Sequence, residues 1–177
     1  MATAVKKSST PVSARRGMNI LAIDQSLVES GISVRGEETN GIETSTLKSG
    51  KLIGLARLQY IRNEVAALLE RYEIQVVVME GYSFGSQGMS VFNLGELGGI
   101  LKLMFKDRGI DLHTIPPSTL KKHIVGKGNA KKEEMLLKIY KKWGVEFSNN
   151  NAADSYGLMK YYEDVIEGNH EYDGQGE

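Results

Sequence analysis

The sequence of 177 residues contains no cysteine, so it can form neither a disulfide framework nor a metal site built from thiolates. It also lacks any run of about 20 apolar residues, the length that a membrane-spanning helix needs, and we expect no membrane partner. Proline is scarce, with three residues, whereas glycine is plentiful, with 20. A hydrophobic fraction of 41% and a charged fraction of 25% are typical of one globular domain with a buried core.

A net charge is absent as well, because 22 Lys and Arg residues balance 22 Asp and Glu residues. The two signs are nevertheless segregated along the chain. Residues 102–142 hold 11 basic and 4 acidic residues, whereas residues 143–177 hold 8 acidic residues and one lysine. This segregation is expected if one face binds a polyanion, and the alternative is a solvated basic helix beside an acidic tail.

The hydrophobic pattern predicts an α/β fold with a mixed five-stranded sheet flanked by helices. We expect a folded domain over 18–166, between a disordered basic arm over 1–17 and a disordered acidic tail over 167–177. The predicted strands are 18–24, 30–36, 41–48, 75–80 and 111–115. The first three should form an antiparallel meander. The predicted helices are 52–72, 90–109, a short basic helix after Pro116-Pro117, about 130–143 and about 151–166.

Three carboxylates each end or interrupt a strongly apolar element. Asp24 ends NILAID and Glu80 ends VVVME, at the carboxyl ends of two predicted strands. If these two strands are neighbours, about 4.8 Å apart, the two acids can reach one ion. Asp154 lies in NAADSYGL, where Ala153 and Gly157 would let its helix approach the same sheet. A hard cation such as Mg²⁺ would remove the repulsion between the three acids, although each alone is an ordinary strand-end or helix-start residue.

The segment STLKKHIVGKGNAKKEE, residues 118–134, is rich in lysine. Asn129 can cap a helix that opens at Ala130, and the free amides there would form an anion site. The segment lacks the GxxxxGK[ST] spacing of an ATPase, so a nucleic-acid backbone is the better anion, and a solvated helix start is the alternative. His123 would contact phosphate or act in acid–base chemistry, or is simply a surface histidine. The candidate DNA-binding lysines are Lys121, Lys122, Lys127, Lys131 and Lys132.

Two aromatic residues, Tyr82 and Phe84, follow Glu80 in the Gly- and Ser-rich stretch GYSFGSQGMS. An aromatic side chain in such a segment, beside a metal site, can stack on an unpaired base. The alternative is that one of them folds back into the core.

Four of these stretches together resemble the RuvC family of Holliday junction resolvases, and its phage branch in particular, over about residues 18–166. They are NILAIDQS, VVVMEGYSF, LKKHIVGKGNAKKEE and NAADSYGL. The third is the most specific, because the lysine, VG, glycine, alanine and lysine of the family recur there as Lys121, Val125-Gly126, Gly128, Ala130 and Lys132.

The resemblance implies a ribonuclease H-like fold and a homodimer that cuts paired strands of four-way DNA junctions in recombination and repair. It makes Asp24, Glu80 and Asp154 ligands of Mg²⁺ or Mn²⁺, with two ions per site. Lys121 and Lys132 would contact DNA or stabilise charge near the scissile phosphate.

The same resemblance gives Tyr82 or Phe84 the stacking role near the junction centre. The helices at 52–72 and 90–109 are our candidates for the dimer face. We expect the cytoplasm of a bacterium or a phage-infected cell, or an organelle matrix if residues 1–17 are a targeting arm. A branch-migration helicase as a partner is left open.

One position departs from the family pattern, which usually places two acids in a DxxD arrangement in its last motif. Here the earlier position is Asn151. Either Asn151 is a weak fourth metal ligand, or it is an inactivating replacement of an aspartate. Three hypotheses follow: a junction resolvase, a ribonuclease H-like nuclease for other branched or hybrid nucleic acids, and an inactive junction-binding module.

Overall fold

Residues 17–82 and 89–168 are described by the structure, a computed structural model of the 177-residue chain. The predicted basic arm, apart from Gly17, lies outside the described residues, and so do Phe84 and residues 169–177 of the predicted tail. Within these described ranges, no helix is both long enough and apolar enough to cross a bilayer.

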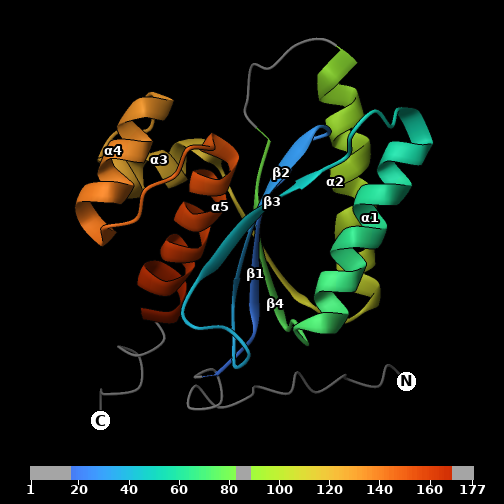
Figure 1. The fold of residues 1–177 in the computed structure, drawn as a ribbon, viewed down its shortest axis with the longest axis horizontal. Coiled ribbons are helices and arrows are strands. Elements are labelled where there is room, and N and C mark those ends of the chain that lie inside the picture. Colours follow the sequence, from blue (N-terminus) through green and yellow to red (C-terminus); the bar gives the residue numbers. More distant parts are fainter. Residues whose placement is uncertain (1–16, 83–88, 169–177) are drawn as a thin grey trace, which may run out of the picture.

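A mixed five-stranded sheet forms the centre of the fold, as the sequence predicts (Figure 1). The middle strand, β1, pairs antiparallel with β2, and β2 pairs antiparallel with β3, which confirms the predicted meander. On its other side β1 pairs in parallel with β4, and β4 with β5. The strands are β1 (Ile20–Asp24), β2 (Glu29–Arg35), β3 (Glu43–Lys48), β4 (Val76–Glu80) and β5 (Asp111–Ile115).

Helices cover both faces of the sheet (Figure 1). One face packs against α1 (Gly54–Arg71) and α2 (Met89–Asp107). The other face packs against α3 (Pro117–Val125), α4 (Lys132–Trp143) and α5 (Asn150–Tyr161). The predicted last helix is right in extent, but its end is a π-helical segment, η2 (Tyr162–Glu167).

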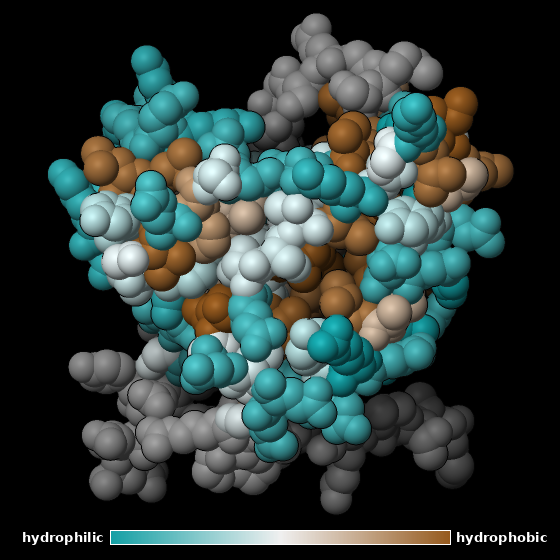
Figure 2. Space-filling model, in the orientation of Figure 1, coloured by the Kyte–Doolittle hydropathy of each residue, from teal (hydrophilic) through white to brown (hydrophobic). Residues whose placement is uncertain are grey.

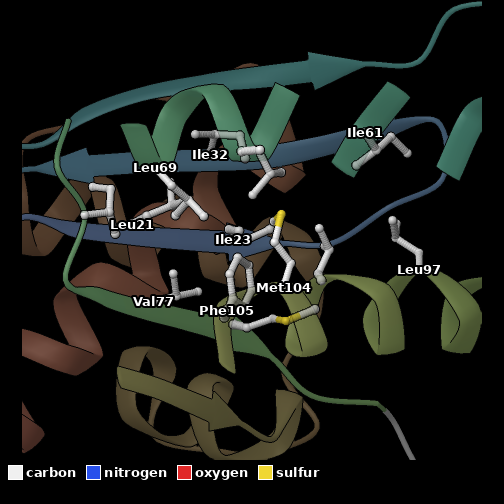
Figure 3. Close-up of a cluster of buried hydrophobic side chains, with 14 of the residues drawn as sticks. Leu21, Ile23, Ile32, Ile61, Leu69, Val77, Leu97, Met104 and Phe105 are labelled. Carbon is white, nitrogen blue, oxygen red and sulfur yellow. The ribbon is translucent and has the colours of Figure 1, made fainter. Parts of the chain in front are cut away.

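Side chains of the central strands alternate between two separate cores. Leu21 and Ile23 of β1 point into the core under α1 and α2, where they meet Phe105 and other apolar side chains (Figure 3). Ile20 and Ala22 point into the core under α3, α4 and α5. Strands buried on both faces are continuous apolar runs in the sequence, which is why these were predicted well.

The same alternation decides where the strand-end acids lie. Asp24 follows Ile20 and Ala22 in the period of two and therefore belongs to the α3–α5 side of the sheet. In the parallel register Ala22 lies beside Val78, so two residues further on Asp24 lies beside Glu80. Both acids end their strands at the same edge and on the same face.

Candidate active site

Asp24 and Glu80 form a directly interacting pair at the carboxyl ends of β1 and β4. The Asp24 side chain is 7% exposed, and its carboxyl group donates a hydrogen bond to the Glu80 carboxylate. Two carboxyl groups can share a hydrogen bond only when one of them keeps its proton. One of the two acids therefore stays neutral until a positive charge nearby compensates its negative charge.

A glycine on the neighbouring strand brings the third acid to this pair. Gly31 of β2 lies opposite Asp24 in the antiparallel ladder. A Cβ atom on Gly31 would overlap the backbone carbonyl of Asn151, so the first turn of α5 rests directly on the strand. Asp154 is one helical turn further along α5. The close contact that places it therefore requires glycine at position 31.

The predicted role of Gly157 in this close approach is wrong. A Cβ atom on Gly157 would make only ordinary contacts with side chains of α3, the nearest being Leu120 at 3.6 Å. The sequence reasoning placed the small residue on the helix, whereas the structure has it on the strand that the helix meets.

Two asparagines hold the start of α5 against the start of β2. Asn149 is the N-cap of α5, and its Oδ1 accepts hydrogen bonds from the backbone N–H groups of Asn151 at 2.9 Å and Ala152 at 3.2 Å. The Asn149 Nδ2 donates to Glu29 Oε1 at 2.9 Å. The Asn151 Nδ2 donates to the backbone carbonyl of Glu29. Asn151, which takes the place of the family's acid, therefore donates a hydrogen bond to Glu29 that a carboxylate could not donate.

The electrostatics of the three acids show why a cation would be favourable. Burial raises the pKa of Asp24 to about 9, and the charges of Glu80 and Asp154 act in the same direction. Burial and the charge of Asp154 raise the pKa of Glu80 to about 7. Burial also raises the pKa of Asp154, against the opposing charges of Lys132 and Lys121. Three acids and two lysines from five elements thus interact in one place.

The turn between α3 and α4 sets the positions of these two lysines. Gly126 ends α3 with a φ of 98°, a left-handed conformation that favours glycine. The chain then turns back, and Lys132 becomes the first residue of α4. The helix is capped by Glu134, whose Oε2 accepts from the Lys131 N–H at 2.7 Å, so the predicted cap at Asn129 is wrong.

The other predicted DNA-binding residues of this segment have different surroundings. Lys122 and Lys131 are exposed, and Lys127 Nζ lies 2.6 Å from Glu134 Oε1 in an exposed ion pair. The His123 Nε2 lies 3.0 Å from Asp164 Oδ2, and the His123 ring packs edge-on against Tyr161. These contacts are with residues outside the group of three acids, which favours the alternative that His123 is simply a surface histidine.

Tyr82 lies across α2 and neither enters a core nor stands free. Its hydroxyl donates to the carbonyl of Gly95 at 3.4 Å, and Lys102 Nζ lies 4.9 Å from its ring centroid. Gly98 leaves the space for this hydroxyl, which a Cβ atom there would overlap. The predicted alternative residue, Phe84, lies outside the described residues.

Sequence reasoning missed Gln25, a buried side chain directly after Asp24. Its Nε2 donates to the backbone carbonyl of Glu80 at 3.4 Å. The sequence could have indicated Gln25, because it is a polar residue directly after a buried strand. Strand side chains alternate between the two faces of the sheet, so the residue after Asp24 points toward α1 and α2.

The donor set fits a hard divalent cation, although the carboxylates are not preformed into a cage. In the described part of the chain, no three Asp, Glu or His side chains already surround one point closely enough to hold a metal ion. Asp24 and Glu80 instead share a hydrogen bond, which must open before their oxygens can bind an ion. Buried carboxylate oxygens with mutual repulsion are the ligands that such a cation prefers.

Comparison with known proteins gives a consistent result. The family model described as "Crossover junction endodeoxyribonuclease RuvC" matches residues 20–157. RuvC of Corynebacterium efficiens is 28% identical over 149 residues, covering 80% of this chain and 67% of that protein. RuvC of Mycobacterium tuberculosis is 26% identical over 148 residues, covering 80% of this chain and 79% of that protein.

Solved structures confirm the fold. Thermus thermophilus RuvC in complex with a Holliday junction superposes with a TM-score of 0.71 at 19% identity, covering 86% of this chain and 97% of that one. The yeast mitochondrial Holliday junction resolvase superposes with a TM-score of 0.59 at 14% identity, covering 88% of this chain and 81% of that one. The ribonuclease H-like architecture predicted from the sequence is therefore correct.

Proposed function

Because the chain belongs to the RuvC family of crossover junction endodeoxyribonucleases, we propose that it is a structure-selective endonuclease that resolves four-way DNA junctions. The observation that carries this proposal is the convergence of Asp24, Glu80 and Asp154 at one edge of the sheet, next to Lys121 and Lys132. The relatives found by comparison are named for the same activity.

The proposed cofactor is Mg²⁺, or Mn²⁺ in its place, with two ions per site. Asp24, Glu80 and Asp154 would hold the ions through carboxylate oxygens. The side-chain amide oxygen of Asn151 would be a neutral fourth ligand. When bound, such ions polarise the scissile phosphodiester and lower the pKa of the water that attacks it.

The remaining groups of the site attract and orient the DNA backbone. Lys121 and Lys132 place positive charge beside the acids, where a phosphate would otherwise meet only negative charge. Lys132 also lies in the first turn of α4, whose free amides attract anions. The exposed side chains of Lys122 and Lys131 would extend this positive surface along the phosphate backbone of the bound DNA.

A homodimer is part of the proposal, because two symmetric nicks in a two-fold junction need two symmetric active sites. Apolar side chains are exposed where α1 and α2 begin, and Figure 2 shows apolar surface over this end of the molecule. Ile53 is 75% exposed, Leu55 81% and Phe92 70%. We propose this end of α1 and α2 as the dimer face, which lies on the opposite side of the sheet from the acids.

A junction-binding module without nuclease activity is the second candidate. It is favoured by Asn151, whose amide nitrogen holds α5 to β2 and whose oxygen brings no charge to the acids. Two-metal chemistry depends on ligand charge, so a set of three acids binds ions less tightly than a set of four.

A cleavage panel separates the candidates. The full chain is incubated with a four-way junction, a flap, an RNA–DNA hybrid and a linear duplex, each with Mg²⁺ and with EDTA. We expect paired Mg²⁺-dependent nicks in the junction alone, and none from an Asp24→Asn variant that still binds the junction. Cleavage of the hybrid but not of the junction would contradict the proposal, and junction binding without any cleavage would favour the second candidate.

A further inference from the structure

Gln25 joins the two acid-bearing strands at a point where the sheet no longer does. The parallel ladder between β1 and β4 pairs residues up to Ile23 and Met79, one residue short of the acids. Beyond that pair, the Gln25 Nε2 donates to the backbone carbonyl of Glu80 at 3.4 Å. This contact therefore ties the residue after one acid to the backbone of the other acid.

The other end of the Gln25 amide is buried and incomplete. Gln25 is 7% exposed, and among the described residues no group forms a hydrogen bond with its Oε1. A buried carbonyl oxygen without a donor is unfavourable, and such groups in native proteins commonly serve a functional site.

A donor for this oxygen is close by on Tyr82. A Cβ atom on Gly98 would lie 2.9 Å from Gln25 Oε1 and would overlap the Tyr82 hydroxyl, so both oxygen atoms border the same small space over Gly98. The present hydrogen bond of the Tyr82 hydroxyl, to the carbonyl of Gly95, is long at 3.4 Å. A small rotation of the Tyr82 side chain would exchange this weak bond for one to Gln25.

Resting on the proposed function, we propose that Gln25 is a positioning residue for the metal site. Its amide fixes the backbone of Glu80 relative to Asp24, and the Tyr82 hydroxyl completes the amide from the side of α2. The two carboxyl groups are thereby kept close together, so that both can bind one divalent cation once the hydrogen bond between them opens. Gln25 touches neither the ion nor the DNA, and it acts through the two ligands.

Outer groups that orient metal ligands commonly change metal affinity by about 10- to 100-fold when they are removed. The matching experiment is a titration of the full chain with Mn²⁺ in the absence of DNA, with free Mn²⁺ followed by electron paramagnetic resonance. Gln25→Ala and the volume-conserving Gln25→Met should both weaken Mn²⁺ binding by about tenfold or more.

Gln75 offers a matched control directly before β4, next to the start of β1. Its Oε1 accepts a hydrogen bond from the Asn19 N–H at 2.7 Å and so links β1 to β4 at the opposite end of the ladder. Gln75→Ala should lower the melting temperature and leave Mn²⁺ affinity unchanged. A loss of affinity in Gln75→Ala equal to that in Gln25→Met would reduce Gln25 to a general structural role and overturn the inference.

Tyr82→Phe tests the second half of the arrangement. It should weaken Mn²⁺ binding, and Gln25→Met should then weaken it by much less in the Tyr82→Phe background than in the wild type, because the two residues act as one unit. Fully additive effects would overturn the link between Gln25 and Tyr82.

The wild type separates failure of this inference from failure of the proposed function. If the wild type binds Mn²⁺ and Asp24→Asn does not, the metal site is supported independently of Gln25. Wild-type affinity in both Gln25 variants would then overturn the positioning role alone. A wild type that binds no Mn²⁺ would overturn the proposed nuclease and the positioning role together.

Discussion

The carboxyl group of Asp24 has Glu80 beside it in the parallel register and Gly31 opposite it in the antiparallel ladder. It thus lies where the two kinds of pairing in the sheet meet, with an acid on one strand and a bare backbone on the other. Single residues at this point decide how much negative charge the fold can bury.

The stability of the metal-free protein should depend on pH through Asp24. In the folded state the pKa of Asp24 is raised from 3.8 to about 9, so the folded state binds more protons than the unfolded state between these values. The stability of the metal-free protein should therefore fall as the pH rises from about 4 to about 9. Asp24→Asn should raise the melting temperature at pH 8 by several degrees and flatten this dependence, as measured by thermal unfolding in EDTA.

Glu43→Gln, at an exposed position on β3, is the control and should leave the pH dependence unchanged. Added Mg²⁺ should raise the melting temperature of the wild type and not that of Asp24→Asn. A lower melting temperature for Asp24→Asn at pH 8 in EDTA would contradict the idea that charge at this site opposes folding.

The second residue-scale prediction concerns Asn151→Asp. The new carboxylate cannot donate to the carbonyl of Glu29, and it adds a fourth acidic group near Asp24, Glu80 and Asp154. We expect the metal-free variant to be less stable by about 1–3 kcal/mol, as measured by denaturant unfolding in EDTA. With Mg²⁺ both forms should nick a four-way junction, at rates within about tenfold of each other. Cleavage by the aspartate form alone would instead identify Asn151 as an inactivating residue.

At the scale of elements, the approach of α5 to β2 holds the site together. Its first turn lies against Gly31, is capped by Asn149 and is tied to Glu29, so backbone contact and hydrogen bonds fix the start of the helix while its buried side chains pack in the core. An element fixed in this way tolerates changes on its outer faces and resists any addition at the contact.

Gly31→Ala should therefore disrupt both stability and the site. Its Cβ atom would overlap the carbonyl of Asn151 and push α5, with Asp154, away from β1. We expect a loss of about 1–3 kcal/mol or more in the free energy of unfolding, together with weakened Mn²⁺ binding. Gly157→Ala, in the same helix, is the control. Its Cβ atom would make only ordinary contacts with side chains of α3, so the substitution should be neutral or stabilising by up to about 1 kcal/mol. Equal effects of the two substitutions would contradict the assigned contact.

The elements themselves were predictable because their patterns are local. Apolar runs such as VVVME and the helical spacing of 52–72 indicate strands and helices without knowledge of their partners. The acids at 24, 80 and 154 stood out because each breaks such a pattern. The contact of Gly31 with Asn151 was missed because it joins residues that only the fold brings together. The cap by Glu134 was missed because the sequence offers a competing local cap at Asn129.

In the molecule as a whole, the sheet separates the three acids from the proposed dimer face. The acids and Lys132 lie on the side of α3, α4 and α5, whereas the three most exposed large apolar residues, Ile53, Leu55 and Phe92, lie where α1 and α2 begin. A dimer formed through α1 and α2 would leave both active sites open to DNA.

Leu55→Lys tests this arrangement. Leu55 is 81% exposed on α1, and a charge there should shift the protein from dimer to monomer in analytical ultracentrifugation. Leu137→Lys, at a 52% exposed position on α4, is the control and should not change the mass. A wild type that sediments as a monomer at all concentrations would contradict the proposed dimer face.

The acids come from segments that are far apart in the chain, near residues 24, 80 and 154. The last of them is also the one whose helix must settle on an early strand. During synthesis on the ribosome, most of the sheet can therefore assemble while the cutting centre is still missing its third carboxylate. A nascent chain that still lacks residue 154 would be unable to damage nucleic acid, so the order of the sequence itself delays cleavage until the third acid has been made.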